Sequence, residues 1–368
     1  MSDKWFVRVI RDIIEVNPKE SLLKGKTAKK ISMDILRPFC RDISKYELTE
    51  YSGGAKFRNG DTIMARITPC LENGKIAKVN ILYDNEVGFG STEYIVFRAK
   101  EGVTDENFVY YLVCSPLIRD PAIKSMVGSS GRQRVQTDVI KNLEVSVPDI
   151  VTQRRIGSLL KSIDDKIAIN TKINENLAQQ AQAIYRSMFV STPYESDRIG
   201  VLSELIAVKY GKDHKKLNDG IYPVYGSGGI MRYVEKPIYE KESVLIPRKG
   251  SLNNVMYIDE PFWSVDTMFY TEMKIANVAK YVFHFLRSKD LASLNAGSAV
   301  PSMTTDILNS MEVSIPSTER LADFENLVAP LYRVMKDNVR QSNNLSLLRD
   351  TLLPKLMSGD IDVSEVKI

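Results

Sequence analysis

Histidine and cysteine are scarce in this chain, and their scarcity limits the chemistry that it can perform. The 368 residues include two histidines, His214 and His284, which are far apart in the sequence. The three cysteines, Cys40, Cys70 and Cys114, all lie in the first third and show no CxxC spacing. The sequence therefore indicates neither a metal site, a disulfide framework, nor histidine-based acid-base catalysis.

Motifs of nucleotide-dependent and DNA-modifying enzymes are also missing. The segment Lys24-Gly25-Lys26-Thr27 ends like a phosphate-binding loop, but Glu20 stands where that loop needs its first glycine. No Pro-Pro pair occurs, so the loop with which amino-methyltransferases hold a flipped base is absent. Asp213-His214-Lys215 is only a crude version of a nuclease site. We expect a non-catalytic chain; a standalone nuclease with a degenerate carboxylate site is the alternative.

Long apolar runs are absent, and the charge balance is mild. No stretch reaches the roughly 18 apolar residues of a membrane span, and the first residues do not read as a signal peptide, so we expect a cytoplasmic protein. Hydrophobic residues make up 43% of the chain, which is typical of a folded protein of two or more domains. Lys and Arg number 50 against 46 Asp and Glu. If DNA binds, its basic partners must be concentrated on one face.

The chain contains an internal repeat. The segment Thr137–Pro148 returns as Thr305–Pro316, 168 residues later, with about half of the positions identical. The same offset continues without a gap and pairs Ile163 with Leu331. The sequence Glu-Val-Ser-Val-Pro alone could be a common way to end a strand. The ungapped continuation favours a duplicated unit instead.

A long helix pattern follows each copy. Apolar or seam residues recur at alternating spacings of four and three, which is typical of a coiled coil. The first seam comprises Ile156, Leu160, Ile163, Ile167, Asn170, Asn174, Leu177 and Ile184, and the second includes Leu331, Met335, Asn338, Leu345 and Leu352. Arg349 weakens the second seam. Each stripe needs a covering partner, either the duplicate helix or the adjacent globular domain. Seam asparagines favour the duplicate, because buried Asn fixes the register of paired helices.

This pattern predicts an α+β protein with two tandem mixed α/β domains, an internal pseudo-two-fold axis and an antiparallel two-helix coiled coil. A helix of roughly 33 residues would be about 50 Å long and would act as a spacer. The predicted segments are a first domain (1–150), a central helix (151–191), a second domain (192–317) and a C-terminal helix (318–368).

The two domains show the same order of predicted elements. In the first, strands are predicted over 60–67, 76–82 and 93–98, followed by a helix over 106–114. In the second, strands are predicted over 242–248, 254–258 and 268–271, followed by a helix over 278–287. Similar frames with different loops suit two halves that recognise different targets.

Candidate DNA-contacting residues lie in loops at the ends of these strands. Arg66 and Arg248 occupy matching strand ends, where arginine can contact guanine, clamp a phosphate, or merely form a surface salt bridge. The segment 128–136 combines Gly and Ser with Arg and Gln, whose forked groups suit base edges, although it could be only a solvated loop. The aromatic residues Tyr225, Phe262 and Trp263 are more typical of a core. The full set of candidates is Arg66, Lys75, Ser129, Ser130, Arg132, Gln133, Arg134, Gln136, Tyr225, Ser227, Arg248, Lys249, Ser251 and Asn253.

The order of these features resembles the specificity subunit of type I restriction-modification enzymes. The resemblance covers essentially the whole chain and rests on the two repeated junctions, the two seam helices and the stretches 222–229, 245–250 and 261–263. It implies that each domain is a target-recognition domain for one half of an interrupted, asymmetric site in double-stranded DNA. The chain is somewhat short for this family.

The resemblance also implies partners that carry the chemistry. Two modification subunits would bind S-adenosylmethionine and methylate adenine, and restriction subunits would use ATP and Mg²⁺; no cofactor is expected in this chain. The helix face with Arg154, Arg155, Lys161 and Lys166 is where we expect modification subunits to dock, unless it is simply solvated. A structural coiled-coil adaptor is a further alternative.

Overall fold

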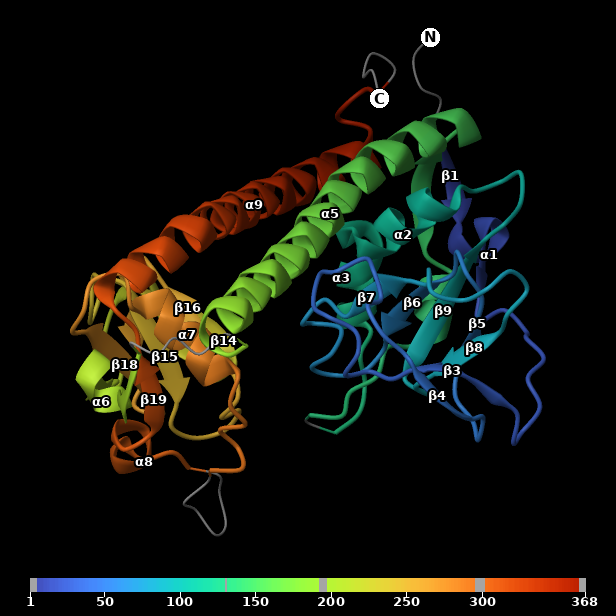
Figure 1. Ribbon diagram of the computed structural model, residues 1–368. Coiled ribbons are helices and arrows are strands. Elements are labelled where there is room, and N and C mark those ends of the chain that lie inside the picture. Colours follow the sequence, from blue (N-terminus) through green and yellow to red (C-terminus); the bar gives the residue numbers. More distant parts are fainter. Residues whose placement is uncertain (1–4, 130, 192–196, 295–301, 364–368) are drawn as a thin grey trace. The chain divides into compact units, whose positions relative to one another are not determined.

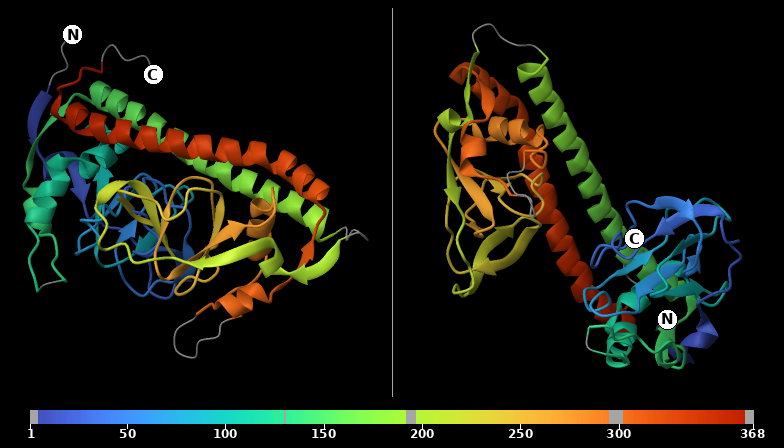
Figure 2. Two further views of the ribbon diagram at one scale, coloured as in Figure 1. Left: turned by 90° about the vertical axis from the view of Figure 1, so that its left-hand side faces the viewer. Right: turned by 90° about the horizontal axis from the view of Figure 1, so that it is seen from below.

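The computed structural model describes residues 5–129, 131–191, 197–294 and 302–363. The chain forms two compact units, one of residues 1–172 and 338–368 and the other of residues 173–337. Each unit contains one globular domain and half of each of two long helices, α5 (Ile150–Phe189) and α9 (Thr318–Ser358). Both helices are drawn as unbroken coils in Figures 1 and 2. The division into units therefore passes through the middle of both helices.

The first unit is built on two small sheets and a two-stranded ribbon. The ribbon pairs β1 (Trp5–Val9) antiparallel with β10 (Glu144–Pro148), directly before α5. One sheet is fully antiparallel and has the order β2 (Ile14–Val16), β9 (Tyr94–Ala99), β6 (Thr62–Ala65), β7 (Ile76–Lys78). The other has the order β4 (Glu47–Glu50), β3 (Thr27–Ile31), β8 (Gly88–Gly90), β5 (Lys56–Phe57), with β3 and β8 parallel.

The helices of the first domain contribute to one of its hydrophobic clusters. They are α1 (Ile10–Ile13), α2 (Glu106–Cys114), α3 (Pro116–Lys124) and α4 (Thr137–Lys141), and α2 packs on the β2-β9-β6-β7 sheet. The carboxylate of Asp105 caps α2 by accepting hydrogen bonds from the backbone N–H groups of Asn107 and Phe108, both at 3.0 Å. The sequence pattern does not predict α3, because Pro121 lies in its interior.

The second unit repeats the ribbon and the antiparallel four-stranded sheet of the first. A ribbon pairs β11 (Arg198–Val201) with β19 (Glu312–Ile315), and one sheet has the order β12 (Ile206–Tyr210), β18 (Met268–Met273), β15 (Ser243–Pro247), β16 (Met256–Ile258). The other sheet has the order β14 (Gly229–Val234), β13 (Asp219–Gly226), β17 (Trp263–Ser264), with β13 and β17 parallel. The helices are α6 (Leu202–Leu205), α7 (Ala279–Arg287) and α8 (Thr305–Asn309).

The predicted duplication is confirmed by this correspondence. The sheet order β2-β9-β6-β7 has its counterpart in β12-β18-β15-β16, and the repeated sequence segments form α4 with β10 and α8 with β19. The first five residues of each repeated segment form a short helix rather than part of a strand. The predicted mixed α/β class and the two long helices are likewise present.

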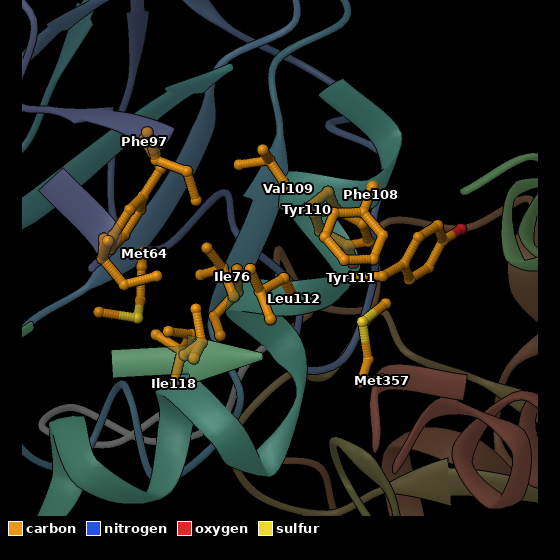
Figure 3. Packing of buried hydrophobic residues seen from close by; sticks show 14 of the residues in the cluster. Met64, Ile76, Phe97, Phe108, Val109, Tyr110, Tyr111, Leu112, Ile118 and Met357 are labelled. Carbon is orange, nitrogen blue, oxygen red and sulfur yellow. The ribbon is translucent and has the colours of Figure 1, made fainter. Parts of the chain in front are cut away.

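Each domain core extends onto the long helices of its own unit. In the first unit, α2 is buried on all sides over Phe108–Val113 and packs against the sheet through residues such as Met64 and Phe97 (Figure 3). Met357 of α9 lies beside Tyr111 of α2 in the same cluster (Figure 3). Among the described residues, no helix combines the length and apolarity needed to cross a membrane.

Candidate nucleic-acid interface

Arg66 and Arg248 occupy equivalent places in the two domains. Arg66 directly follows β6, and Arg248 directly follows β15. The backbone N–H of Arg66 donates to the Glu93 carbonyl at 2.9 Å, and that of Arg248 donates to the Thr267 carbonyl at 2.9 Å. The carbonyls of the two arginines accept from Val135 and Met303, which are themselves 168 residues apart. The structure therefore holds both arginines in the same local frame.

The loop predicted over 128–136 is closed by a hairpin-like bridge. Val127 and Arg134 exchange backbone hydrogen bonds of 2.9 and 3.0 Å. Gly128 and Gly131 have φ values of 134° and 78°, a region that glycine adopts without strain. A side chain on Gly128 would also approach the Arg132 carbonyl oxygen at 3.0 Å. The two glycines thus allow the tight turn that presents Arg132.

A carboxylate that the sequence analysis did not single out joins two of the predicted arginines. Glu93 accepts from Arg134 Nε at 3.0 Å on both carboxylate oxygens and from Arg134 Nη2 at 2.8 Å. It also accepts from Arg66 Nε at 3.2 Å. Arg134 is the main reason why the pKa of Glu93 lies below its ordinary value. The loop arginine is therefore held in one orientation by a charged partner.

The remaining candidates of the first unit are accessible to different degrees. Ser129, Arg132 and Gln136 are exposed, and Gln133 is half-buried, with its carbonyl accepting from the Thr68 N–H at 3.0 Å. Lys75 donates from Nζ to the Met33 carbonyl at 2.8 Å. Ser130 lies outside the described residues. Contact of these residues with DNA stays a prediction.

In the second unit several candidates already have structural partners. The Tyr225 side chain is buried in an aromatic cluster with Phe262 and Trp263, as expected of core aromatics. Asn253 bonds to Asp290 at 2.9 Å and accepts from the Ala292 N–H at 3.0 Å. Lys249 and Ser251 are exposed, Ser227 and Arg248 are half-buried, and the Arg248 guanidinium lies over the Tyr210 ring at 5.4 Å. DNA contact by Tyr225 and Asn253 also stays a prediction.

Within each unit the two long helices run antiparallel. In the first unit, Asn170 of α5 donates to Gln341 Oε1 of α9 at 2.8 Å, and Asp164 pairs with Arg349. An earlier residue of α5 therefore contacts a later residue of α9. In the second unit, Asn174 donates to the Met335 carbonyl at 3.0 Å, and Met188 lies beside Arg320. The seam asparagines thus bond across the helix pair, and Asn170 also donates to the backbone carbonyl of the seam residue Asn338 at 3.4 Å.

The two interpretations of the helix stripe both apply, to different parts of the seam. Ile156 and Leu160 are buried in the first domain core, while Asn170 bonds across the helix pair. In the second unit, Ala181 of α5 and Phe324 of α9 are buried in the domain core. The outer parts of the helices therefore pack on the globular domains, and the central parts on each other.

Arg349, which interrupts the apolar seam in the sequence, has a buried partner in the structure. It is 9% exposed, and its Nη1 donates to Asp164 Oδ1 at 2.8 Å. The hydroxyl of Tyr111, on α2, donates to Asp164 Oδ2 at 2.7 Å. This triad of residues from α2, α5 and α9 joins the first domain to both long helices.

An uncharged triad lies at the corresponding place in the second unit. His284 of α7 is fully buried, with Nδ1 at 2.7 Å from Gln182 Oε1 of α5 and Nε2 at 3.0 Å from the Tyr332 hydroxyl of α9. Burial lowers the pKa of His284 to about 4. The neutral ring can donate to Gln182 and accept from Tyr332, so both nitrogens are satisfied.

The basic face predicted for partner docking is accessible. Arg154, Arg155, Lys161 and Lys166 are exposed on α5, and Lys161 pairs with Asp165 at 2.5 Å. Among residues 5–129, 131–191, 197–294 and 302–363, no group of three or more His, Cys, Asp or Glu side chains could hold a metal ion.

Comparisons with known proteins agree with this arrangement. The family model for the type I restriction modification DNA specificity domain matches residues 2–179 and 193–323. The chain is 23% identical over 310 residues to the type I restriction enzyme MjaIX specificity subunit of Methanocaldococcus jannaschii, covering 73% of this chain and 71% of that protein. It is 22% identical, over an alignment of 414 residues, to the HindI specificity subunit of Haemophilus influenzae, covering 83% of this chain and 87% of that protein. The crystal structure of a type I restriction-modification S subunit from M. genitalium has the same fold, with a TM-score of 0.58 at 18% identity and 96% of each chain covered. Because the family model matches most of both units, the chain belongs to the type I restriction-modification DNA specificity family.

Proposed function

We propose that this chain is the non-catalytic DNA specificity subunit of a type I restriction-modification complex. Each globular domain would read one half of an asymmetric, interrupted site in double-stranded DNA. The observation that carries the proposal is the duplicated fold with different loops at equivalent strand ends, Arg66 with the 127–134 hairpin in one domain and Arg248 with Tyr210 in the other. Two domains with equivalent strands and helices but different loops suit the recognition of two half-sites that differ in sequence.

The long helices would set the spacing between the two half-sites. The 40 residues of α5 and 41 of α9 are each continuous, and their outer parts are built into the domain cores. The triads at Asp164 and His284 further restrict rotation of each domain against its own helix segments. A continuous helix sets a spacing better than a flexible linker does, because the distance between its ends is fixed, whereas that of a flexible linker varies.

Partner subunits would supply the reaction. We expect two modification subunits, which bind S-adenosylmethionine and methylate adenine, and restriction subunits, which use ATP and Mg²⁺, in a cytoplasmic complex. The exposed basic face of α5 around Arg154 and Lys166 supports docking of the modification subunits there. Its four cations would meet an acidic or carbonyl-rich helix surface.

Two measurements test this function. The tagged chain is purified from native lysate, and an adenine methyltransferase is expected to co-purify. Methylated adenines are then mapped in the genome of cells with and without the chain; they are expected in an interrupted motif with two different halves, and only when the chain is present. DNA cleavage by the purified chain with Mg²⁺ alone would indicate the nuclease instead. Absence of DNA binding even with the methyltransferase present would indicate a structural adaptor.

A further inference from the structure

We infer that Glu93 is a specificity-determining residue of the first domain, which orients Arg134 so that its guanidinium recognises a guanine in one half-site. The inference rests on the proposed DNA-reading function. It names guanine as the base that is recognised and the pair of Glu93 with Arg134 as the arrangement that recognises it. Its observation is the bidentate pair between Glu93 and Arg134, which lies at the base of the 127–134 hairpin.

The pair leaves one edge of the arginine available. Glu93 accepts from Nε and Nη2, the side edge of the guanidinium. Within the part of the chain that the structure describes, no hydrogen bond from Arg134 Nη1 is formed, and the side chain is 44% exposed. The free end edge, Nη1 with the second hydrogen of Nη2, is the fork that matches the O6 and N7 acceptors of guanine in the major groove.

Charge favours a base over a phosphate as the target. A carboxylate that accepts three hydrogen bonds from Arg134 and one from Arg66 neutralises part of their positive charge. It would also repel a phosphate placed against the same guanidinium. A guanine edge is uncharged and presents two acceptors, so the carboxylate can orient the arginine without repelling its target.

The position of Arg134 is occupied by a different residue type in the second domain. The bridge between Ile67 and Arg134 corresponds to the bridge between Lys249 and Ser302, and Ser302 lies 168 residues after Arg134. A serine hydroxyl cannot form a guanidinium fork. The guanine contact is therefore assigned to the half-site of the first domain.

The test uses the full chain assembled with its modification subunits and a duplex that carries the site found by methylation mapping. Each guanine of the site is replaced in turn by 7-deazaguanine, which lacks the N7 acceptor. Wild-type complex is expected to lose about 10-fold in affinity at one guanine of one half-site. In Glu93→Gln, binding to the unmodified site is expected to fall by about 10-fold, and the effect of that 7-deazaguanine is expected to shrink to less than about 3-fold. Non-specific binding is expected to strengthen and its salt dependence to steepen by about one unit, because a negative charge has been removed.

Two further variants separate orientation from charge and from folding. Arg134→Lys keeps the positive charge but loses the fork, so it is expected to behave like Glu93→Gln at the sensitive guanine. Asp266→Asn removes an exposed carboxylate from the corresponding loop of the second domain and is expected to change nothing at that guanine. Methylation at the full site by each variant complex reports whether the subunit is still folded and assembled.

The outcomes are distinct. A wild-type complex without sequence preference would overturn the proposed function as a whole. A sequence-specific complex in which no 7-deazaguanine has an effect, or in which Glu93→Gln leaves that effect intact, would overturn the role of Glu93 alone. Full specificity in Arg134→Lys would identify Arg134 as a phosphate contact and would likewise overturn the inference.

Discussion

The buried ion pair between Asp164 and Arg349 gives the sharpest prediction about stability. The two side chains are 6% and 11% exposed, and the Asp164 carboxylate accepts from both Arg349 and Tyr111. Replacing Arg349 with Met leaves the buried carboxylate with only the tyrosine hydroxyl. Removing one partner of a buried pair typically costs about 3–5 kcal/mol, and we expect about 3 kcal/mol here because Tyr111 remains.

A three-residue replacement should recover most of this loss. In the variant Tyr111→Phe, Asp164→Leu, Arg349→Met, no buried charge or unpaired hydroxyl remains, and the three helices pack through apolar groups of similar size. Such replacements are often neutral or stabilising, so we expect a free energy of unfolding within about 1 kcal/mol of wild type.

Urea denaturation followed by far-ultraviolet circular dichroism measures these changes. Because the chain has two compact units, two transitions can occur, and only that of the first unit should move. In a thermal melt followed by the same signal, the midpoint temperature of the first unit should fall by roughly 6–12 °C for Arg349→Met. Arg333→Met, an exposed change on the same helix, serves as the control. A loss below about 1 kcal/mol for Arg349→Met, or a triple variant less stable than the single one, would refute the reasoning.

Three further predictions concern pH, spacing and half-site binding. Burial lowers the pKa of His284 to about 4, whereas an unfolded histidine has a pKa of about 6.5. Between these two pH values the unfolded state binds a proton that the folded state does not. The free energy of unfolding should therefore fall by up to about 3 kcal/mol as the pH drops from 7 to 4. Denaturation at both pH values should show a shallower fall in His284→Phe, and an unchanged fall would contradict the assignment. Insertion of seven residues into both α5 and α9 should lengthen each helix by about 10 Å. At roughly 3.4 Å per base pair, the gap in the mapped methylation motif should then be longer by about 3 base pairs. An unchanged gap would show that the helices do not set the spacing. Alanine at Arg132 should weaken competition binding to one half-site by roughly 10-fold, whereas equal loss at both halves would argue against separate recognition domains.

Sequence patterns predicted the local elements of this protein well where the signal is periodic. The strands at β6, β7 and β9 and the helices α2 and α7 appear within a few residues of the predicted ranges. The helix α3 was missed because Pro121 breaks the expected pattern, yet the helix begins at Pro116, where proline is favoured. Short elements such as α4 and α8 were also not predicted, because five residues are too few to show a period.

The sequence by itself determined the duplication, the two long amphipathic helices and the family. Each of these depends on identity or periodicity along the chain, and such patterns persist whatever the tertiary contacts are. It also identified Arg66 and Arg248 at matching strand ends and Arg134 in a loop.

Only the tertiary structure decided which charged groups meet. Glu93 is 41 residues from Arg134, and Asp164 is 185 residues from Arg349, so no local pattern links either pair. In the sequence Arg349 interrupts an apolar seam; in the structure it is a buried partner of Asp164. The physical reason is that the free energy of a buried charge depends on what the folded chain places within about 3 Å of it, and that neighbour is chosen by how the helices and sheets close, not by residues nearby in sequence.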